Sequence, residues 1–293
     1  MDYTPNVFEC DHRVMGTPSL ASWRVGVILR GLREDRGLSI REAAKILGTN
    51  KTRLERVEKA ENQKVDPGTV AGWAFIYSAP EQIIHELETL ARQSRETDAN
   101  GWENVFSTTP KWFNAFLTLE KEAMTIDSYE AAYIPGLLQV QAYMEALYEA
   151  EPSLTTAASA EATRVKLLRQ DWVFNRPPGK LAKMRFILDE ACVLRINGAP
   201  YYEEQIRRLR EVAALDSVEV SVLSIDRGIH PAMPGAFKLM SFAGPYTPEL
   251  LYIDSVYGSR YIDERHGVAR AREVFSDSLA CVVDVEEYLS SVE

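Results

Sequence analysis

The chain has 293 residues, 46% of them hydrophobic, and a formal net charge of −10. This length allows two or more compact units, and the acidity excludes a protein that coats nucleic acid over its whole surface. The charge is uneven, because residues 20–65 contain eleven Lys and Arg against six Asp and Glu. That part carries +5 and the remainder −15. We therefore expect DNA contacts only in the basic N-terminal part.

The three cysteines, Cys10, Cys192 and Cys281, lie far apart and form no CxxC pair. They predict neither a disulfide framework nor a zinc site, and we expect no metal and no cofactor. Residues 1–22 contain acids and prolines in place of a signal-peptide core, and no run of about eighteen apolar residues occurs. These features predict a flexible leader over residues 1–22. They also predict a cytoplasmic protein that associates with the nucleoid when it binds DNA.

Helix signals begin directly after the leader. Apolar residues at helical spacing predict a helix over residues 23–36. Ser39, followed three residues later by Glu42, forms a capping box that starts a second helix. Gly48 ends that helix, at the position where a C-cap favours a left-handed residue.

A third helix follows after a tight turn. Asn50 is a good N-cap residue. Leu54 and Val57 form a narrow apolar face on the third helix, and its other positions are polar and mostly basic. Residues 38–58 therefore predict a helix-turn-helix.

The DNA-binding domain is expected to span residues 23–95. Apolar spacing predicts two more helices, over residues 67–77 and 80–91, which complete a small bundle. The polar run Gln93–Asn100 predicts a linker or a fraying helix end. The C-terminal domain then spans residues 96–293.

The C-terminal part alternates between helix and strand patterns. A dense aromatic set predicts a helix at its start and comprises Trp102, Phe106, Trp112, Phe113 and Phe116. Strands are predicted over residues 126–134, 184–188, 218–223, 237–242 and 250–253. Helices are predicted over residues 138–148, 201–214 and 264–280 and around Val165–Val173, where Arg169 faces water or an acidic neighbour. The predicted fold class is therefore α+β, an all-α helix-turn-helix bundle followed by a mixed α/β domain.

The N-terminal residues resemble a known family. They are similar to the signature of the xenobiotic-response-element (XRE) type of helix-turn-helix regulator, which is phage-repressor-like and lambda-repressor-like. The resemblance covers about Trp23–Pro80 and rests on Arg33, Glu34, Gly37, Leu38, Ser39, Ala44, Gly48, Leu54 and Glu58. The remainder resembles the WhiJ-like or antitoxin-like branch of Streptomyces and relatives. That likeness rests on Ile134–Gln139, Arg169-Gln170, Leu188–Ala191 and Gly235–Leu239.

The resemblance implies a transcriptional regulator that binds double-stranded operator DNA, often together with a small partner protein encoded nearby. Base contacts would fall on Lys51, Thr52 and Arg56, around the start of the third helix. This placement is physically sensible, because the N-terminal end of a recognition helix enters the major groove, where Arg and Lys donate to guanine. A homodimer would place two such helices about one DNA turn apart and read an inverted repeat.

The resemblance also assigns the neighbouring residues. Ser39, Arg41 and Arg53 would face phosphates, with Asn50 at the start of the helix, where backbone amides hold phosphates. Arg33 and Glu58 would pair and fix the angle of the third helix.

One position departs from the family pattern. Ala60 stands where the family usually has glycine. We therefore expect the third helix to run on to Asn62 and the following loop to differ.

A second interpretation concerns ligand binding or catalysis by the C-terminal domain. Phe186–Glu190 is similar to a Walker B strand, but no GxxxxGK[ST] loop occurs, so a buried strand that ends in acidic residues is favoured. Glu190, His230, Asp254 and Arg260 are expected near strand ends, where α/β sheets bind ligands. The sequence contains no evident pairing of a catalytic nucleophile with a general base, so we expect a regulator that is not an enzyme. The alternative is a small-molecule enzyme or a ligand-binding domain that the helix-turn-helix tethers to DNA.

Overall fold

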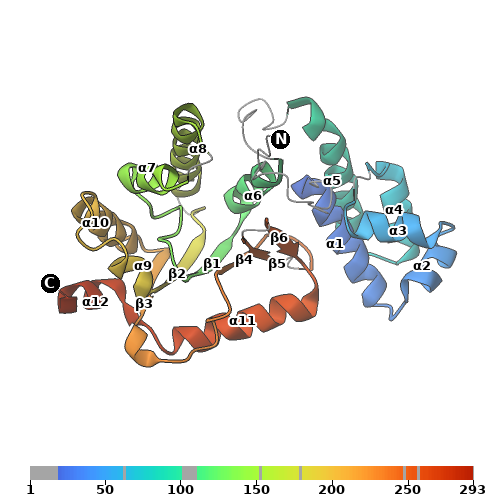
Figure 1. Cartoon of the computed structure of the whole chain (residues 1–293). Helices are drawn as coiled ribbons and strands as arrows, with labels where there is room; N and C mark the ends of the chain where they lie inside the picture. The colour runs from blue at the N-terminus through green and yellow to red at the C-terminus, as the bar shows by residue number, and fades with distance from the viewer. Residues whose placement is uncertain are drawn as a thin grey trace, which may run out of the picture. The chain divides into compact units, whose positions relative to one another are not determined.

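A computed structural model of the chain describes residues 19–61, 64–100, 111–151, 154–177, 180–246, 249–255 and 258–292. These residues form two compact units, which are described separately below (Figure 1). The division falls between Leu119 and Glu120, and residues 243–246 are grouped with the first unit. Within the described ranges, no helix has the length and apolar character needed to cross a membrane.

The first unit is helical, as predicted. Its helices are α1 (Leu20–Glu34), α2 (Ile40–Ile46), α3 (Lys51–Glu58), α4 (Pro67–Ile76) and α5 (Glu81–Asn100). The α1 helix begins three residues before the predicted start at Trp23. The Ser19 hydroxyl accepts a hydrogen bond from the Ser22 amide at 3.1 Å and caps the helix there.

The polar run Gln93–Asn100 is the last part of α5. The linker alternative for this run is therefore wrong, and the helix alternative is confirmed. No Gly or Pro interrupts the run, and its Gln, Arg and Glu residues are good helix formers. A polar composition alone was not a sufficient reason to end the helix.

The helices of the first unit enclose an apolar core. Leu29, Leu54, Val70 and Leu87 come from four different helices, and each is 0% exposed. Full burial of an aliphatic side chain stabilises a fold by about 1.5–3 kcal/mol. The core therefore fixes the packing of the helix-turn-helix against α1, α4 and α5.

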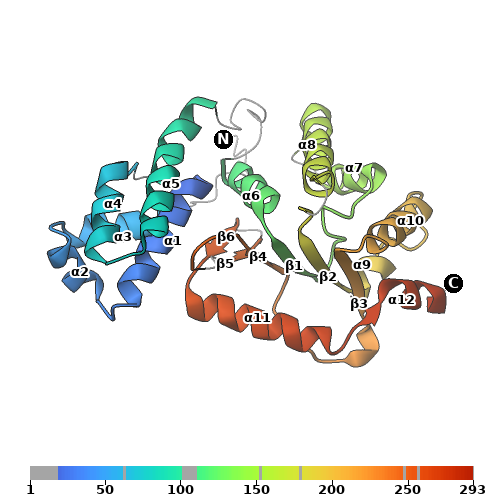
Figure 2. The same ribbon diagram turned by 180° about the vertical axis from the view of Figure 1, so that it is seen from behind.

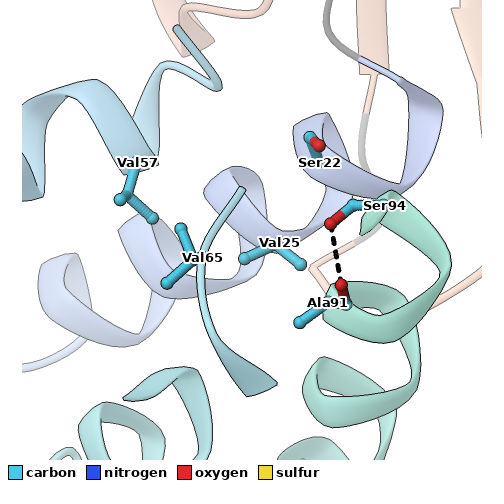
Figure 3. Close-up of a pocket in the computed structure, with 6 residues that line it drawn as sticks. All are labelled: Ser22, Val25, Val57, Val65, Ala91 and Ser94. Carbon is cyan, nitrogen blue, oxygen red and sulfur yellow. Dashed lines mark hydrogen bonds between the residues drawn. The ribbon is translucent and has the colours of Figure 1, made fainter. Parts of the chain in front are cut away.

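A small hollow lies beside this core, and Figure 3 shows the side chains around it. Its lining residues are Ser22, Val25, Val57, Val65, Ala91 and Ser94. Its volume of about 10 Å³ has room for at most one water molecule. The Ser94 hydroxyl already donates to the Ala91 carbonyl at 2.8 Å. The hollow is therefore a packing gap and not a ligand site.

The second unit is built on a sheet. Its strands are β1 (Thr125–Glu130), β2 (Lys183–Asp189), β3 (Val218–Leu223), β4 (Phe237–Ser241), β5 (Glu249–Ile253), β6 (Arg260–Ile262) and β7 (Val283–Asp284). Over the described residues the strand order is β6-β5-β4-β1-β2-β3-β7. The β1, β2 and β3 strands are parallel to one another, and the other neighbouring pairs are antiparallel. The mixed sheet and the helical first unit confirm the predicted α+β class.

Helices cover both faces of the sheet (Figures 1 and 2). They are α6 (Lys111–Glu122), α7 (Gln141–Glu149), α8 (Thr156–Phe174), α9 (Glu190–Leu194), α10 (Tyr202–Ala213), α11 (Arg265–Leu279) and α12 (Val285–Val292). The α11 helix lies along one face, where Phe275 packs with Tyr129 and Ile187 of the sheet. The α7 and α8 helices lie on the opposite face.

The aromatic set that precedes the second unit is only partly described. Trp102 and Phe106 lie outside the described residues, as do the side chains of Trp112 and Phe113. Phe116 is buried on α6, which agrees with the predicted helix.

Five short elements of the described residues were not predicted, one of which is the 3-10 helix Ile225–Arg227. The α9 helix has five residues, β6 has three and β7 has two, and such lengths carry too little periodicity to identify. The α12 helix has eight residues, and Val285, Tyr288 and Leu289 are its buried positions. Their helical spacing was a usable signal that the sequence analysis overlooked.

Glu120 on α6 lies between two cations in the interior of the second unit. Arg169 on α8 donates to the Glu120 carboxylate through Nε and through Nη2, the latter at 2.7 Å, and Lys238 on β4 donates through Nζ at 3.1 Å. All three side chains are buried. Burial would raise the pKa of Glu120, but the attraction of Arg169 and Lys238 outweighs it and lowers the pKa to about 2. Arg169 thus faces an acidic neighbour, one of the two predicted alternatives.

Replacing Glu120 with Gln removes the buried carboxylate that pairs with both Arg169 and Lys238. We expect the free energy of unfolding to fall by about 3–5 kcal/mol at neutral pH. The folded-state pKa of Glu120 is depressed, so its contribution is present above the unfolded pKa of about 4.5 and is lost as the pH falls toward about 2. Denaturant unfolding of both proteins at several pH values measures this difference.

The matched control for this experiment is Glu122→Gln, because Glu122 is exposed on the same helix. The control should change stability by less than about 0.5 kcal/mol. A gap between the wild type and Glu120→Gln that stays constant from neutral pH to pH 2 would contradict the assignment.

Candidate nucleic-acid interface

The helix-turn-helix is held by local caps. The Ser39 hydroxyl accepts from the Glu42 amide at 3.3 Å, and the Glu42 carboxylate accepts from the Ser39 amide at 2.9 Å, which completes the predicted capping box. Gly48 has φ +65° and turns the chain. Asn50 then caps α3, where its Oδ1 accepts from the Arg53 amide at 2.8 Å. Each predicted cap in this stretch is confirmed.

The α3 helix has an inner and an outer face. Leu54 and Val57 are buried in the core. Lys51, Thr52, Arg53 and Arg56 are exposed, and so are Ser39, Arg41 and Asn50 on the preceding helix and turn. The seven predicted contact residues thus all lie at exposed positions of one continuous stretch.

The exposed cations of this stretch differ in their partners. Lys51 lies 3.9 Å from the Glu55 carboxylate, which also accepts from Lys59 at 3.0 Å. Arg53 lies over the ring of Trp73, with 5.8 Å from its guanidinium carbon to the ring centroid. In the described part of the chain, no carboxylate forms an ion pair with Arg41, Arg53 or Arg56. Their charges are available to an anionic surface.

Trp73 was predicted only as a core residue of α4. Its contact with Arg53 is a role that the sequence analysis missed. A cation over an aromatic face gains about 0.5–1 kcal/mol at exposed sites. The contact therefore limits the directions in which Arg53 can extend.

A bidentate ion pair joins α1 to α3. Arg33 donates through Nε to Glu58 Oε1 at 2.7 Å and through Nη2 to Glu58 Oε2 at 2.8 Å. Its Nη1 donates to the Leu38 carbonyl, in the turn before α2, at 2.9 Å. The side chains are 12% and 5% exposed, so solvent screens the pair only weakly. The predicted pairing of Arg33 with Glu58 is confirmed.

Close backbone packing supports the same contact. A Cβ at Gly26 of α1 would lie 2.5 Å from the Glu58 carbonyl oxygen and 2.8 Å from that of Val57. Only glycine therefore allows α1 to approach the end of α3 this closely. The role of Gly26 was not predicted, because a glycine within an apolar helical pattern does not indicate which element packs against it.

The predicted extension of α3 to Asn62 is wrong. The helix ends at Glu58, and Ala60 adopts the left-handed conformation with φ +54°. The amides of Ala60 and Glu61 donate to the carbonyls of Val57 and Arg56, as in a glycine-ended helix. The ending is thus retained although alanine stands where glycine is favoured.

Comparison with protein families gives two matches. Residues 24–87 match a helix-turn-helix domain, and residues 113–288 match a family described as a domain of unknown function, DUF5753. The second match covers more than half of the chain. The chain belongs to the DUF5753 family. Comparison with curated proteins and with solved structures gives no match.

The four predicted pocket residues of the DUF5753 region lie along one edge of its sheet. Glu190 follows β2, and His230 lies between β3 and β4. Asp254 follows β5, and Arg260 pairs with Ile253 at the start of β6. Since β4 and β1 separate β5 from β2, about 14 Å of strand spacing lies between Asp254 and Glu190. A common pocket for the four residues stays a prediction.

Glu190 and His230 already have protein contacts. The Glu190 carboxylate accepts from Ser224 Oγ at 3.0 Å, the Ile225 amide at 2.7 Å and the Tyr288 hydroxyl at 3.0 Å. Burial would raise the pKa of Glu190, but these three hydrogen bonds lower it overall. His230 Nε2 lies 3.7 Å from Asp189 Oδ2. The acidic end of β2 thus anchors the segment that follows β3, a role that the Walker B likeness did not predict.

The Arg33 and Glu58 pair should show strong energetic coupling. Without Arg33 the buried Glu58 loses its ion-pair partner, and without Glu58 the guanidinium of Arg33 keeps, among the described residues, only its longer ion-pair contact with Glu34 at 3.4 Å. We therefore expect the two single alanine variants together to cost more stability than the double variant. A double-mutant cycle of Arg33→Ala and Glu58→Ala by thermal unfolding should give a coupling energy above about 1 kcal/mol. The exposed pair Arg92 and Glu88 is the matched control and should couple by less than about 0.5 kcal/mol.

Replacing Ala60, which has a left-handed backbone conformation, with glycine should stabilise the fold. Glycine lacks the Cβ that makes this conformation costly, so Ala60→Gly should raise the free energy of unfolding by about 0.5–1 kcal/mol. The reverse change at Gly48, which has φ +65°, should lower it. A destabilising Ala60→Gly would show that burial of the Ala60 methyl outweighs its backbone strain.

Proposed function

We propose that this protein is a sequence-specific DNA-binding transcriptional regulator. The helix-turn-helix domain points to a DNA-binding regulator, and the basic, exposed side of α3 supports the finer proposal. The observation that carries it is an exposed Arg56 without an acidic partner in the described residues, on a helix that the Arg33 and Glu58 pair holds in place.

In this proposal the residues divide into two groups. Lys51, Thr52 and Arg56 contact base edges in the major groove, where Arg and Lys donate to O6 and N7 of guanine. Ser39, Arg41 and Arg53 contact phosphates. Asn50 orients the first turn of α3 toward the DNA backbone. This division is supported by the position of Arg53, which lies over Trp73 at the flank of the helix.

The proposal extends to assembly and control. The protein binds an inverted-repeat operator as a homodimer, because two symmetric recognition helices double the sequence that is read. The DUF5753 region controls this binding through a ligand or a small partner protein. The acidic charge outside residues 20–65 supports this division of labour, because an acidic surface is repelled by phosphates.

The two contact groups should respond differently to substitution. After an operator is selected from random DNA with the full-length protein, Arg56→Ala should cost about 1–3 kcal/mol of binding and relax specificity at one base position. Arg41→Ala should weaken binding to all sequences alike and reduce the salt slope by about one. Fluorescence anisotropy at several salt concentrations measures both effects.

The control for this experiment is Arg92→Ala, because Arg92 is exposed on α5 and paired with Glu88. It should leave affinity and salt slope unchanged. If Lys51→Ala and Arg56→Ala together leave operator affinity and its salt dependence at the wild-type values, α3 is not the reading helix.

A further inference from the structure

Exposed apolar side chains gather at one end of the second unit. Leu194 ends α9, and Ile225, Ile229 and Met233 lie in the segment between β3 and β4. Ile229 is 94% exposed, and Met233 and Ile225 are 59% and 57% exposed. Because β2 and β3 are parallel, the segments after them leave the same edge of the sheet. Large exposed apolar groups in such proximity mark interaction surfaces.

The Glu190 carboxylate ties three parts of this surface together. Leu194 lies four residues after Glu190 on α9 and therefore on the same side of the helix. The Ile225 amide donates directly to Glu190, and so does the Tyr288 hydroxyl of α12. Val292, 51% exposed, lies four residues after Tyr288. Figures 1 and 2 both show α9, α12 and the segment after β3 at this end of the unit.

The segment that carries Ile229 and Met233 is held by buried anchors. His230 has a 7% exposed side chain beside Asp189, and Ala232 is 1% exposed in the core. The Met233 amide donates to the His230 carbonyl at 3.3 Å. With these anchors turned inward, Ile229 and Met233 remain at exposed positions. The surface is therefore preorganised, which lowers the entropy cost of binding.

Exposed side chains of both charges border the surface. Arg195, Asp226, Arg227 and Glu287 are exposed, and within the described residues none of them forms an ion pair. Two are cations and two are anions. A strongly basic or strongly acidic partner would therefore meet repulsion as well as attraction.

We propose that this surface, formed by Leu194, Ile225, Ile229, Met233 and Val292, binds the same surface of a second copy of the chain. In a twofold interface the same surface of both copies meets, so that every contact between two different residues occurs twice. Asp226 and Arg227 are neighbours of opposite charge, so Asp226 of each copy can pair with Arg227 of the other while the apolar side chains meet at the centre. An apolar centre with a charged rim is the usual anatomy of such interfaces.

The inference deepens the proposed function, because it names the surface that forms the dimer, but its test needs no DNA. Sedimentation velocity of the full-length protein should show a monomer and dimer equilibrium. Ile229→Asp should weaken dimerisation by at least tenfold, since it places a charge at the centre of the interface. The fold should be retained, because Ile229 is almost fully exposed, and circular dichroism verifies this.

The matched control is Leu215→Asp. Leu215 is an exposed apolar residue before β3, at the opposite edge of the sheet, and its substitution should leave dimerisation unchanged. Asp226→Arg and Arg227→Asp should each weaken the dimer at low salt, and the double swap should restore it, because only a twofold pairing regenerates the contact.

Three results would overturn the inference. They are a wild-type monomer at the highest attainable concentration, a dimer insensitive to Ile229→Asp, and a double swap no better than the single variants. A dimer that behaves as expected but binds no operator would instead refute the proposed function and leave this interface standing.

Discussion

The contact of Arg33 with Glu58 is the constraint on which the DNA-binding unit depends. An eight-residue helix such as α3 is too short to be stable alone, and its two buried apolar residues leave its rotation loosely defined. The bidentate pair fixes both the distance and the relative orientation of α1 and α3. The third hydrogen bond, to the Leu38 carbonyl, joins the start of α2 to the same guanidinium. One side chain of α1 thus sets the relation of both helices that form the motif.

The second unit uses the same physical device in a stricter form. Glu120 is fully buried, and Arg169 and Lys238 are nearly so. Replacing such a cluster with apolar residues can be neutral for stability, but removing a single member is not. The cluster therefore joins α6, α8 and β4 in one specific arrangement. Glu190 does the same at the sheet edge, where one carboxylate receives hydrogen bonds from two separate segments.

Local rules predicted the features that depend on neighbouring residues. The Ser39 and Glu42 box, the Gly48 turn and the Asn50 cap each involve residues within three positions of one another, and all occur as expected. The strand patterns of the sequence also identified five strands of the sheet. Ala60 shows the limit of such rules, because α3 ends at Glu58 and Ala60 adopts a left-handed conformation that alanine rarely takes.

Contacts between distant residues were not readable in the same way. Glu120 and Arg169 are 49 positions apart, and Glu190 and Tyr288 are 98 apart, so neither pair leaves a periodic signal. The pairing of Arg33 with Glu58 was expected only through family resemblance. The seven predicted contact residues are exposed together because they lie on one local motif. Glu190 and Asp254 follow different strands, and the strand order that separates them depends on how the whole sheet assembles.

The proposed dimer would link the contacts of Glu190 in the second unit to operator binding. Two half-sites on one operator bind much more tightly when their domains are linked, because the second contact becomes intramolecular. In the proposed dimer, the parts of the interface are joined through Glu190, so an event that disturbs the Ser224, Ile225 or Tyr288 contacts would disturb the interface. A ligand or partner that moves α12 or the segment after β3 would lower operator affinity by loosening the dimer. It would do so without touching Lys51, Thr52 or Arg56.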